Sequence, residues 1–188
     1  MRVAIVNAGL GGSTGNSARL CEHAARGLSG VQSEVVVLAE RSGFEANRAL
    51  IERADALVLA TGTYWDAWSS HLSRFLEEAT PTEGSEVWLG KPVAVLVSCH
   101  EVGAKGVLSR LQGVLSCFGC LVPPMSGVVI SFASQLAREH ASEEETSDLW
   151  RPDDVDVAMH NLLEAARGAR NWRAWEVDRV GYARRWLR

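Results

Sequence analysis

The 188-residue chain has no apolar run close to the roughly 18 residues that a membrane-spanning helix needs. The apolar stretch Val3–Val6 is shorter than the core of a signal peptide, and no convincing cleavage region follows it. The four cysteines, at positions 21, 99, 117 and 120, are too few and too scattered for a disulfide scaffold. We therefore expect a cytoplasmic protein without stable membrane insertion.

An excess of positive charge is also missing, because the formal net charge is -4 at pH 7. Such a chain has no global positive field to attract nucleic acid, and we expect no nucleic-acid partner. With 47% hydrophobic residues, the chain is long enough for one sizeable core and short for two. The composition therefore predicts one domain over residues 1–188.

Short apolar runs alternate with helical patterns along most of the chain. The expected strands are residues 2–8, 33–38, 56–61, 91–98 and 127–131, and the expected helices are residues 16–28, 45–53, 68–79, 107–119 and 153–169. Five strands that alternate with five helices predict an α/β fold with a parallel sheet covered on both faces.

Three segments interrupt this alternation. The polar segment 80–89 predicts an exposed loop, and residues 133–152 form an insertion before the last helix. The acidic run Glu143–Glu145 in that insertion indicates a solvated surface rather than a metal site. The tail 170–188 is rich in arginine and tryptophan, which favours contact with another subunit or packing on this one over a helix on a membrane surface.

Glycines and small polar residues fill the turn between the first expected strand and the first expected helix. At a helix start, unpaired backbone N–H groups and the helix dipole favour an anion, and glycines let the backbone approach it closely. No lysine stands in the Walker position, and Thr14 stands where G-x-G-x-x-G requires its third glycine. The turn predicts a phosphate site, with an ordinary capped turn as the alternative. The predicted phosphate-binding residues are Gly11, Ser13, Thr14, Gly15, Asn16 and Ser17.

Two further loops follow central strands of the expected sheet. The first runs from Thr61 to Trp65 and ends in a pair of aromatic residues, and the second runs from Ser98 to Gly106 and contains His100. Ligands of open parallel α/β sheets bind beyond the carboxyl ends of the strands. We therefore expect these loops to lie beside the phosphate site.

The segments quoted so far carry a resemblance to a known family. Ser13–Ser17 resembles the phosphate loop of flavodoxins, and Asp55–Trp65 resembles the second flavin loop of NAD(P)H-dependent FMN reductases and related quinone reductases. The resemblance covers roughly residues 2–131. Two residues depart from the pattern: Thr63 stands where proline is usual, and Trp68 is bulkier than the residue normally found near this turn.

The resemblance implies a flavodoxin-like three-layer sandwich with strand order 2-1-3-4-5, FMN as cofactor and NADPH or NADH as co-substrate. It implies reduction of a quinone, a flavin or a similar small acceptor by ping-pong hydride transfer, in a homodimer or homotetramer. His100 and Tyr64 are the expected catalytic residues, since an imidazole can donate a proton near neutral pH. The expected ring contacts are Thr61, Gly62, Thr63, Tyr64, Trp65, Ser98, Cys99, His100 and Gly103. No metal site is expected.

Other interpretations remain open at this stage. Cys99 and Lys105 have the spacing of a phosphatase Cys-x5-Arg loop, but lysine lacks the planar fork of arginine. Cys117 and Cys120 have redox or zinc spacing without a second pair nearby, so we expect buried free thiols. An electron-carrier flavodoxin and a non-enzymatic interaction protein that retains the fold are the alternative functions.

Overall fold

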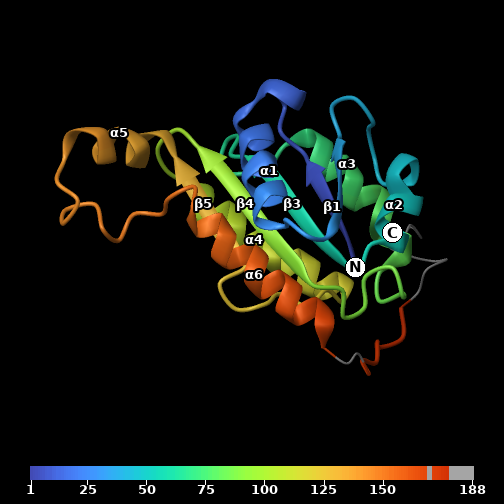
Figure 1. The fold of residues 1–188 in the computed structure, drawn as a ribbon. Coiled ribbons are helices and arrows are strands. Elements are labelled where there is room, and N and C mark those ends of the chain that lie inside the picture. Colours follow the sequence, from blue (N-terminus) through green and yellow to red (C-terminus); the bar gives the residue numbers. More distant parts are fainter. Residues whose placement is uncertain (169–170, 178–188) are drawn as a thin grey trace.

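A five-stranded parallel sheet with strand order β2-β1-β3-β4-β5 forms the centre of the computed structural model, which describes residues 1–168 and 171–177 (Figure 1). The strands are β1 (Arg2–Asn7), β2 (Gln32–Val37), β3 (Ala56–Gly62), β4 (Val93–Cys99) and β5 (Gly127–Ser131). All four neighbouring pairs are parallel. The strand order confirms the flavodoxin-like sandwich expected from the sequence.

Besides the strands, the described residues form six α-helices and three short 3-10 helices. The α-helices are α1 (Asn16–Gly27), α2 (Arg48–Arg53), α3 (Ser70–Ala79), α4 (Ala104–Phe118), α5 (Phe132–His140) and α6 (Asp154–Arg167). The 3-10 helices are η1 (Gly12–Thr14), η2 (Glu45–Asn47) and η3 (Thr80–Thr82). None of these helices in the described part of the chain is long and apolar enough to cross a membrane.

The sheet separates two hydrophobic cores because successive strand residues point to opposite faces. In β1, Ile5 packs into the core beneath α1 and α6, whereas Val6 packs into the core beneath α2, α3 and α4. The central strand β3 is buried along its whole length, as expected of a strand covered on both sides. Layers on both faces leave the carboxyl ends of the strands as the open edge.

The expectation of an exposed loop at 80–89 is wrong, because this segment carries a core residue. Trp88 is fully buried, and its Nε1 donates a hydrogen bond of 2.7 Å to Thr82 Oγ1. Its ring packs against those of Phe44, Phe75 and Phe118, with centroids 5.6, 6.4 and 5.2 Å away. The sequence did not indicate that Trp88 is a core residue, because most of its neighbours in the segment are polar.

The insertion at 133–152 begins within helix α5, which the sequence pattern did not predict. Ser131 caps this helix by accepting a hydrogen bond of 3.0 Å from the Ser134 N–H. The helix extends past the edge of the sheet beside β5 (Figure 1). The expected burial of Cys117 and Cys120 holds only for Cys120, since Cys117, in the last turn of α4, is exposed.

Candidate functional site

The loops that follow β1, β3 and β4 meet at the carboxyl edge of the sheet and enclose a cavity of about 210 Å³. The cavity is lined by Gly9, Gly11, Gly15, Asn16, Ser17, Gly62, Thr63, Tyr64, Ser98, Cys99 and His100. Ten of these eleven residues are candidates from the sequence, all but Gly9. The fold therefore brings the three loops that the sequence singled out to one cavity.

The first loop is held by the side chain of Asn7, the last residue of β1. Its Oδ1 accepts a hydrogen bond of 3.0 Å from the Gly9 N–H, and its Nδ2 donates one of 2.8 Å to the Gly12 carbonyl. Gly12 has a φ of +56°, which glycine adopts without strain. Sequence reasoning missed Asn7, although a buried amide at the end of an apolar strand is a recognisable signal.

The same loop turns so tightly that its glycines touch. A Cβ atom on Gly11 would lie 2.8 Å from the Gly15 Cα, and one on Gly9 would lie 2.6 Å from Ser17 Oγ. Within the described residues, the N–H groups of Gly15, Asn16 and Ser17 have no acceptor. These N–H groups stand at the positive end of the α1 dipole, a position that favours a negatively charged group.

Tyr64 ties the second loop to the first. Its hydroxyl accepts a hydrogen bond of 3.1 Å from the Leu10 N–H. Its ring lies back over Gly62, where a Cβ atom would be 2.8 Å from the hydroxyl oxygen. The phenol therefore forms one wall of the cavity and fixes the spacing of the two loops.

Trp65 and Asp66 form the tip of the second loop. Both have a positive φ, of 50° and 57°, between the paired residues Tyr64 and Ala67. The Trp65 side chain is fully exposed and lies outside the cavity. The Asp66 carboxylate packs against Gly103, where a side chain would clash. This tip is a strained turn with a large apolar side chain in solvent.

Thr63 supplies an unpaired polar atom to the cavity. Its Oγ1 is buried and has no hydrogen-bond partner in the part of the chain that the structure describes. Its N–H donates a hydrogen bond of 2.8 Å to the Ser98 carbonyl, which joins the second loop to the third. The other unusual residue, Trp68, lies outside the cavity and donates a hydrogen bond of 3.1 Å to Ser73 Oγ.

The third loop contributes Cys99 and His100. Burial raises the pKa of the Cys99 thiol, which reduces its thiolate fraction at neutral pH. His100 is exposed, its ring centroid is 6.0 Å from that of Phe132, and its carbonyl accepts a hydrogen bond of 2.9 Å from the Ala133 N–H. His100 thus stands between the cavity and helix α5.

The remaining candidates lie outside the cavity. Ser13 and Thr14 are exposed on the turn η1, and Thr61 is buried in β3, where its hydroxyl accepts a hydrogen bond of 3.2 Å from the Ser69 N–H. Gly103, with a φ of +89°, begins α4. These residues lie close to the cavity because their neighbours in the chain line it, but they do not line it themselves.

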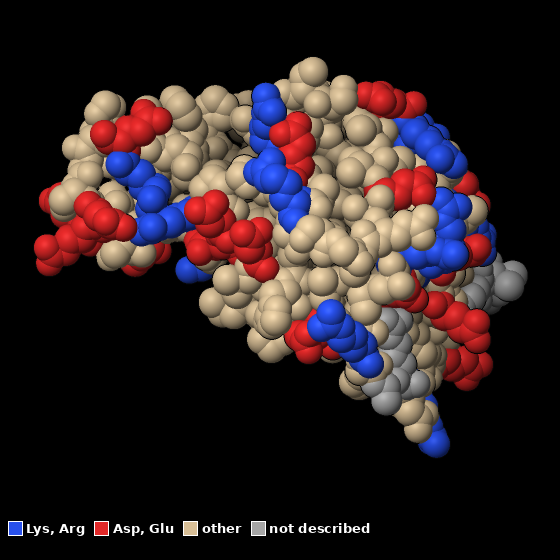
Figure 2. Space-filling model, viewed as in Figure 1, with Lys and Arg blue, Asp and Glu red and all other residues tan. Residues whose placement is uncertain are grey.

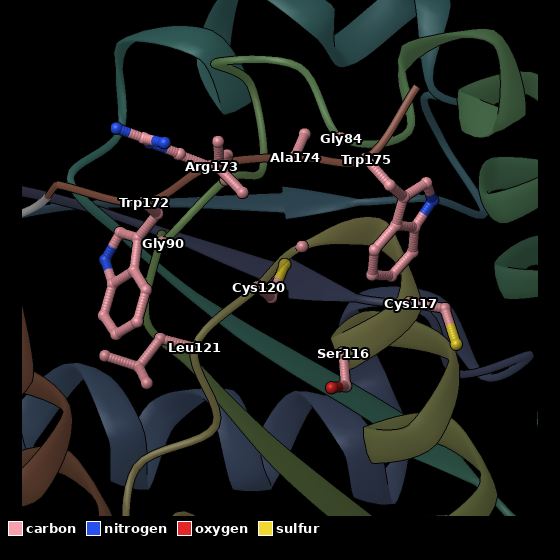
Figure 3. Close-up of a pocket in the computed structure, with 12 residues that line it drawn as sticks. Gly84, Gly90, Ser116, Cys117, Cys120, Leu121, Trp172, Arg173, Ala174 and Trp175 are labelled. Atoms are coloured by element: carbon pink, nitrogen blue, oxygen red, sulfur yellow. The ribbon is translucent and has the colours of Figure 1, made fainter. Parts of the chain in front are cut away.

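Another cavity, of about 200 Å³, lies at the opposite edge of the sheet (Figure 3). Trp172 and Trp175 project from the described part of the tail, and the Trp172 ring packs against Gly90. Because sites in open parallel sheets lie at the carboxyl edge, this cavity is not the predicted ligand site. Tyr182 and Trp186 lie outside the described residues.

The chain belongs to the NADPH-dependent FMN reductase family, whose sequence model matches residues 1–135. Membership makes it a flavoprotein oxidoreductase, with FMN as the flavin and a reduced nicotinamide as the reductant that the family name specifies. Among curated proteins, none matches the chain.

Solved structures with the same fold include oxidoreductases. An oxidoreductase from Corynebacterium diphtheriae is 15% identical, with a TM-score of 0.65 over 88% of this chain and 96% of that one. An NADH:FMN oxidoreductase in its apo form is 17% identical, with a TM-score of 0.63 over 87% and 88%. RosB, solved with a bound 8-demethyl-8-formylriboflavin-5'-phosphate intermediate, is 17% identical, with a TM-score of 0.66 over 89% and 79%.

The residues present fit FMN in their chemistry. The unpaired N–H groups at the start of α1 suit a phosphate, and the unpaired Thr63 hydroxyl suits the polar edge of a flavin ring. The cavity of about 210 Å³ is smaller than the roughly 300–1,000 Å³ usual for small-molecule sites, but a second cavity adjoins it. Acidic and basic side chains are interleaved across the face of the molecule in Figure 2.

Proposed function

We propose that this protein is an FMN-dependent NAD(P)H oxidoreductase that reduces a quinone, a flavin or a similar small acceptor. The overall reaction converts NAD(P)H, a proton and a quinone into NAD(P)⁺ and a hydroquinone. The two substrates would use the same face of the site in turn, which is a ping-pong scheme. The observation that carries the proposal is the convergence of unpaired donors from two loops on one cavity.

Bound FMN would supply the redox chemistry, accepting two electrons from the nicotinamide and passing them to the acceptor. The N–H groups of Gly15, Asn16 and Ser17 would hold its phosphate, with Ser13 and Thr14 close by. Thr63 Oγ1 would donate to the polar edge of the ring. Tyr64 would keep the phosphate loop and the ring loop at a fixed distance through its hydrogen bond to the Leu10 N–H.

His100 is the proposed proton donor to the reduced acceptor. Its ring lines the cavity and is exposed, so a ring N–H can reach an acceptor oxygen while exchanging its proton with water. The His100 backbone is held by the Ala133 N–H, which limits its movement. A homodimer or homotetramer remains part of the proposal, as does a location in the cytoplasm.

The decisive experiment is the visible spectrum of the purified protein before and after addition of FMN, followed by NADPH oxidation with menadione. We expect a shifted flavin spectrum, quenched flavin fluorescence and initial rates that give parallel double-reciprocal lines. Flavin binding without NADPH oxidation would instead identify an electron carrier. If neither spectrum nor fluorescence of FMN changes, the protein is not a flavoenzyme.

A further inference from the structure

A second cavity, of about 170 Å³, adjoins the first on the side of α1 and α5. The two cavities share Asn16, Ser98 and Cys99 as lining residues, so they are separated by no more than these side chains. Nothing in the sequence pattern indicated this second cavity, because helix α5 was not predicted within the insertion at 133–152. Apart from those three residues, the side chains that line it have no role in the proposed flavin site.

Helix α1 presents one stripe of side chains to this cavity. Asn16, Arg19, Leu20 and His23 all line it, and their spacing of three, four and seven residues places them on one face of the helix. Arg19 lies about 4.5 Å and His23 about 10.5 Å further along the helix axis than Asn16. The Arg19 guanidinium and the His23 imidazole thus follow one another along α1, away from the proposed phosphate site.

Arg19 also contacts a neighbouring carboxylate, so a bound anion would have to compete with it for the guanidinium. Its guanidinium is 2.9 Å from Glu22 in an exposed pair, where attraction is weak and screened. Glu22 does not line the cavity, and no Asp or Glu is found among the described residues that do. The described lining therefore offers hydrogen-bond donors to an anion and contains no carboxylate that would repel it.

Helix α5 supplies a buried donor from the opposite side. Gln135 lines the cavity, and its Nε2 is buried without a hydrogen-bond partner among the described residues. An unpaired buried amide is costly to the folded protein, whereas an acceptor atom from a ligand would satisfy it. Phe132, 57% exposed, adds an aromatic face at the mouth of the same cavity.

Helix α5 is attached directly to the proposed flavin site. The Ala133 N–H donates to the His100 carbonyl over 2.9 Å, and the Phe132 ring lies beside the His100 ring. The family model ends at residue 135, so most of this helix lies beyond the segment that it matches. Of the eleven residues that line the second cavity, ten lie within the matched segment and Pro152 lies beyond it.

We propose that this second cavity is the acceptor subsite and that it selects planar aromatic compounds carrying a carboxylate, through Arg19 and Gln135. Phe132 and Leu20 would contact the apolar ring, while the guanidinium and the amide would hold the carboxylate. This assignment of substrate class rests on the proposed function. The binding site itself can be tested without any redox step.

The test is calorimetric titration of the FMN-loaded protein with 2-naphthoate and with the uncharged 2-naphthamide, neither of which is reduced. We expect 2-naphthoate to bind about tenfold more tightly. Arg19→Gln should abolish this preference, and Gln135→Leu should weaken both ligands. Arg74→Gln, which removes a similar exposed helix pair far from the cavity, and Leu136→Ala on α5 are the matched controls.

Equal affinity for both ligands in the parent protein, or a preference that persists in Arg19→Gln, would overturn the proposal. Competition between 2-naphthoate and FMN would also overturn it, because the ligand would then occupy the flavin cavity. FMN affinity should be unchanged in every variant, and no variant should lower the melting temperature by more than a few degrees; Gln135→Leu, which removes the unpaired amide, should raise it. A protein that fails to bind FMN yet shows the expected 2-naphthoate pattern would disprove the oxidoreductase function and retain the anionic-aromatic site.

Discussion

The loop Gly9–Ser17 and the loop Gly62–Ala67 adjoin the same cavity but are built in opposite ways. The first places glycine where φ is positive, at Gly12, and is tied down by both polar atoms of Asn7. The second places Trp65 and Asp66 at positive φ, where glycine would be relaxed. The first is a relaxed loop of unpaired backbone donors, and the second stores strain at its tip.

This difference indicates which groups of each loop would recognise a ligand. A phosphate needs backbone N–H groups in a fixed arc, which small residues provide with little dependence on side chains. A strained turn persists only where the surrounding structure holds it, and such turns concentrate at functional sites. The three predictions below separate the two loops, beginning with the largest expected effect.

Gly11→Ala should reduce the affinity for FMN by about 10- to 100-fold, because its Cβ would lie 2.8 Å from the Gly15 Cα and displace the donors. The affinity for riboflavin, which has no phosphate, should change little. The measurement is a titration of flavin fluorescence quenching. Gly113→Ala, a glycine on α4 with open space around it, is the control and should bind FMN normally.

An equal loss of affinity for FMN and riboflavin would contradict this view of the first loop. The loop would then contact the ring as well as the phosphate. A fall in melting temperature without a change in flavin preference would make Gly11 a purely structural residue. The comparison between the two loops would fail in either case.

The phosphate loop was the part of the site most accessible to sequence reasoning. Its glycines and the start of α1 are local features that a linear pattern records. The unpaired Thr63 hydroxyl depends on how the second and third loops pack, which no local pattern encodes. The Asn7 amide binds only its own loop, so it was a local signal that the sequence reasoning overlooked. Trp88 was missed because its neighbours in the sequence are polar, and helix α5 was missed because it is short and buries no residue fully, so its apolar pattern is weak.

Replacing Trp65-Asp66 by Asn-Gly should stabilise the protein by about 1 kcal/mol, since two positive φ values in a two-residue turn favour these residues. The melting temperature should rise by about 2–4 °C. Val102→Asn is the control, because Val102 is an equally apolar side chain, 80% exposed, without a positive φ. A lower melting temperature in the double variant would show that the turn is not strained.

The alkylation rate of Cys99 distinguishes a ligand on the ring side of the cavity from a ligand on the phosphate side. Burial raises its pKa, so its thiolate fraction is small at neutral pH and iodoacetamide should alkylate it several-fold more slowly than exposed Cys117. Cys21 and Cys120, with pKa values raised to about 12 by burial, should react only after unfolding.

Added FMN should slow alkylation of Cys99 further and leave Cys117 unaffected, whereas inorganic phosphate alone should change neither rate. Peptide mass spectrometry after timed quenching measures each site. Protection of Cys99 by phosphate alone would mean that an anion at the start of α1 already closes the cavity. The two loops would then respond to one ligand group together, because Tyr64 links them through Leu10.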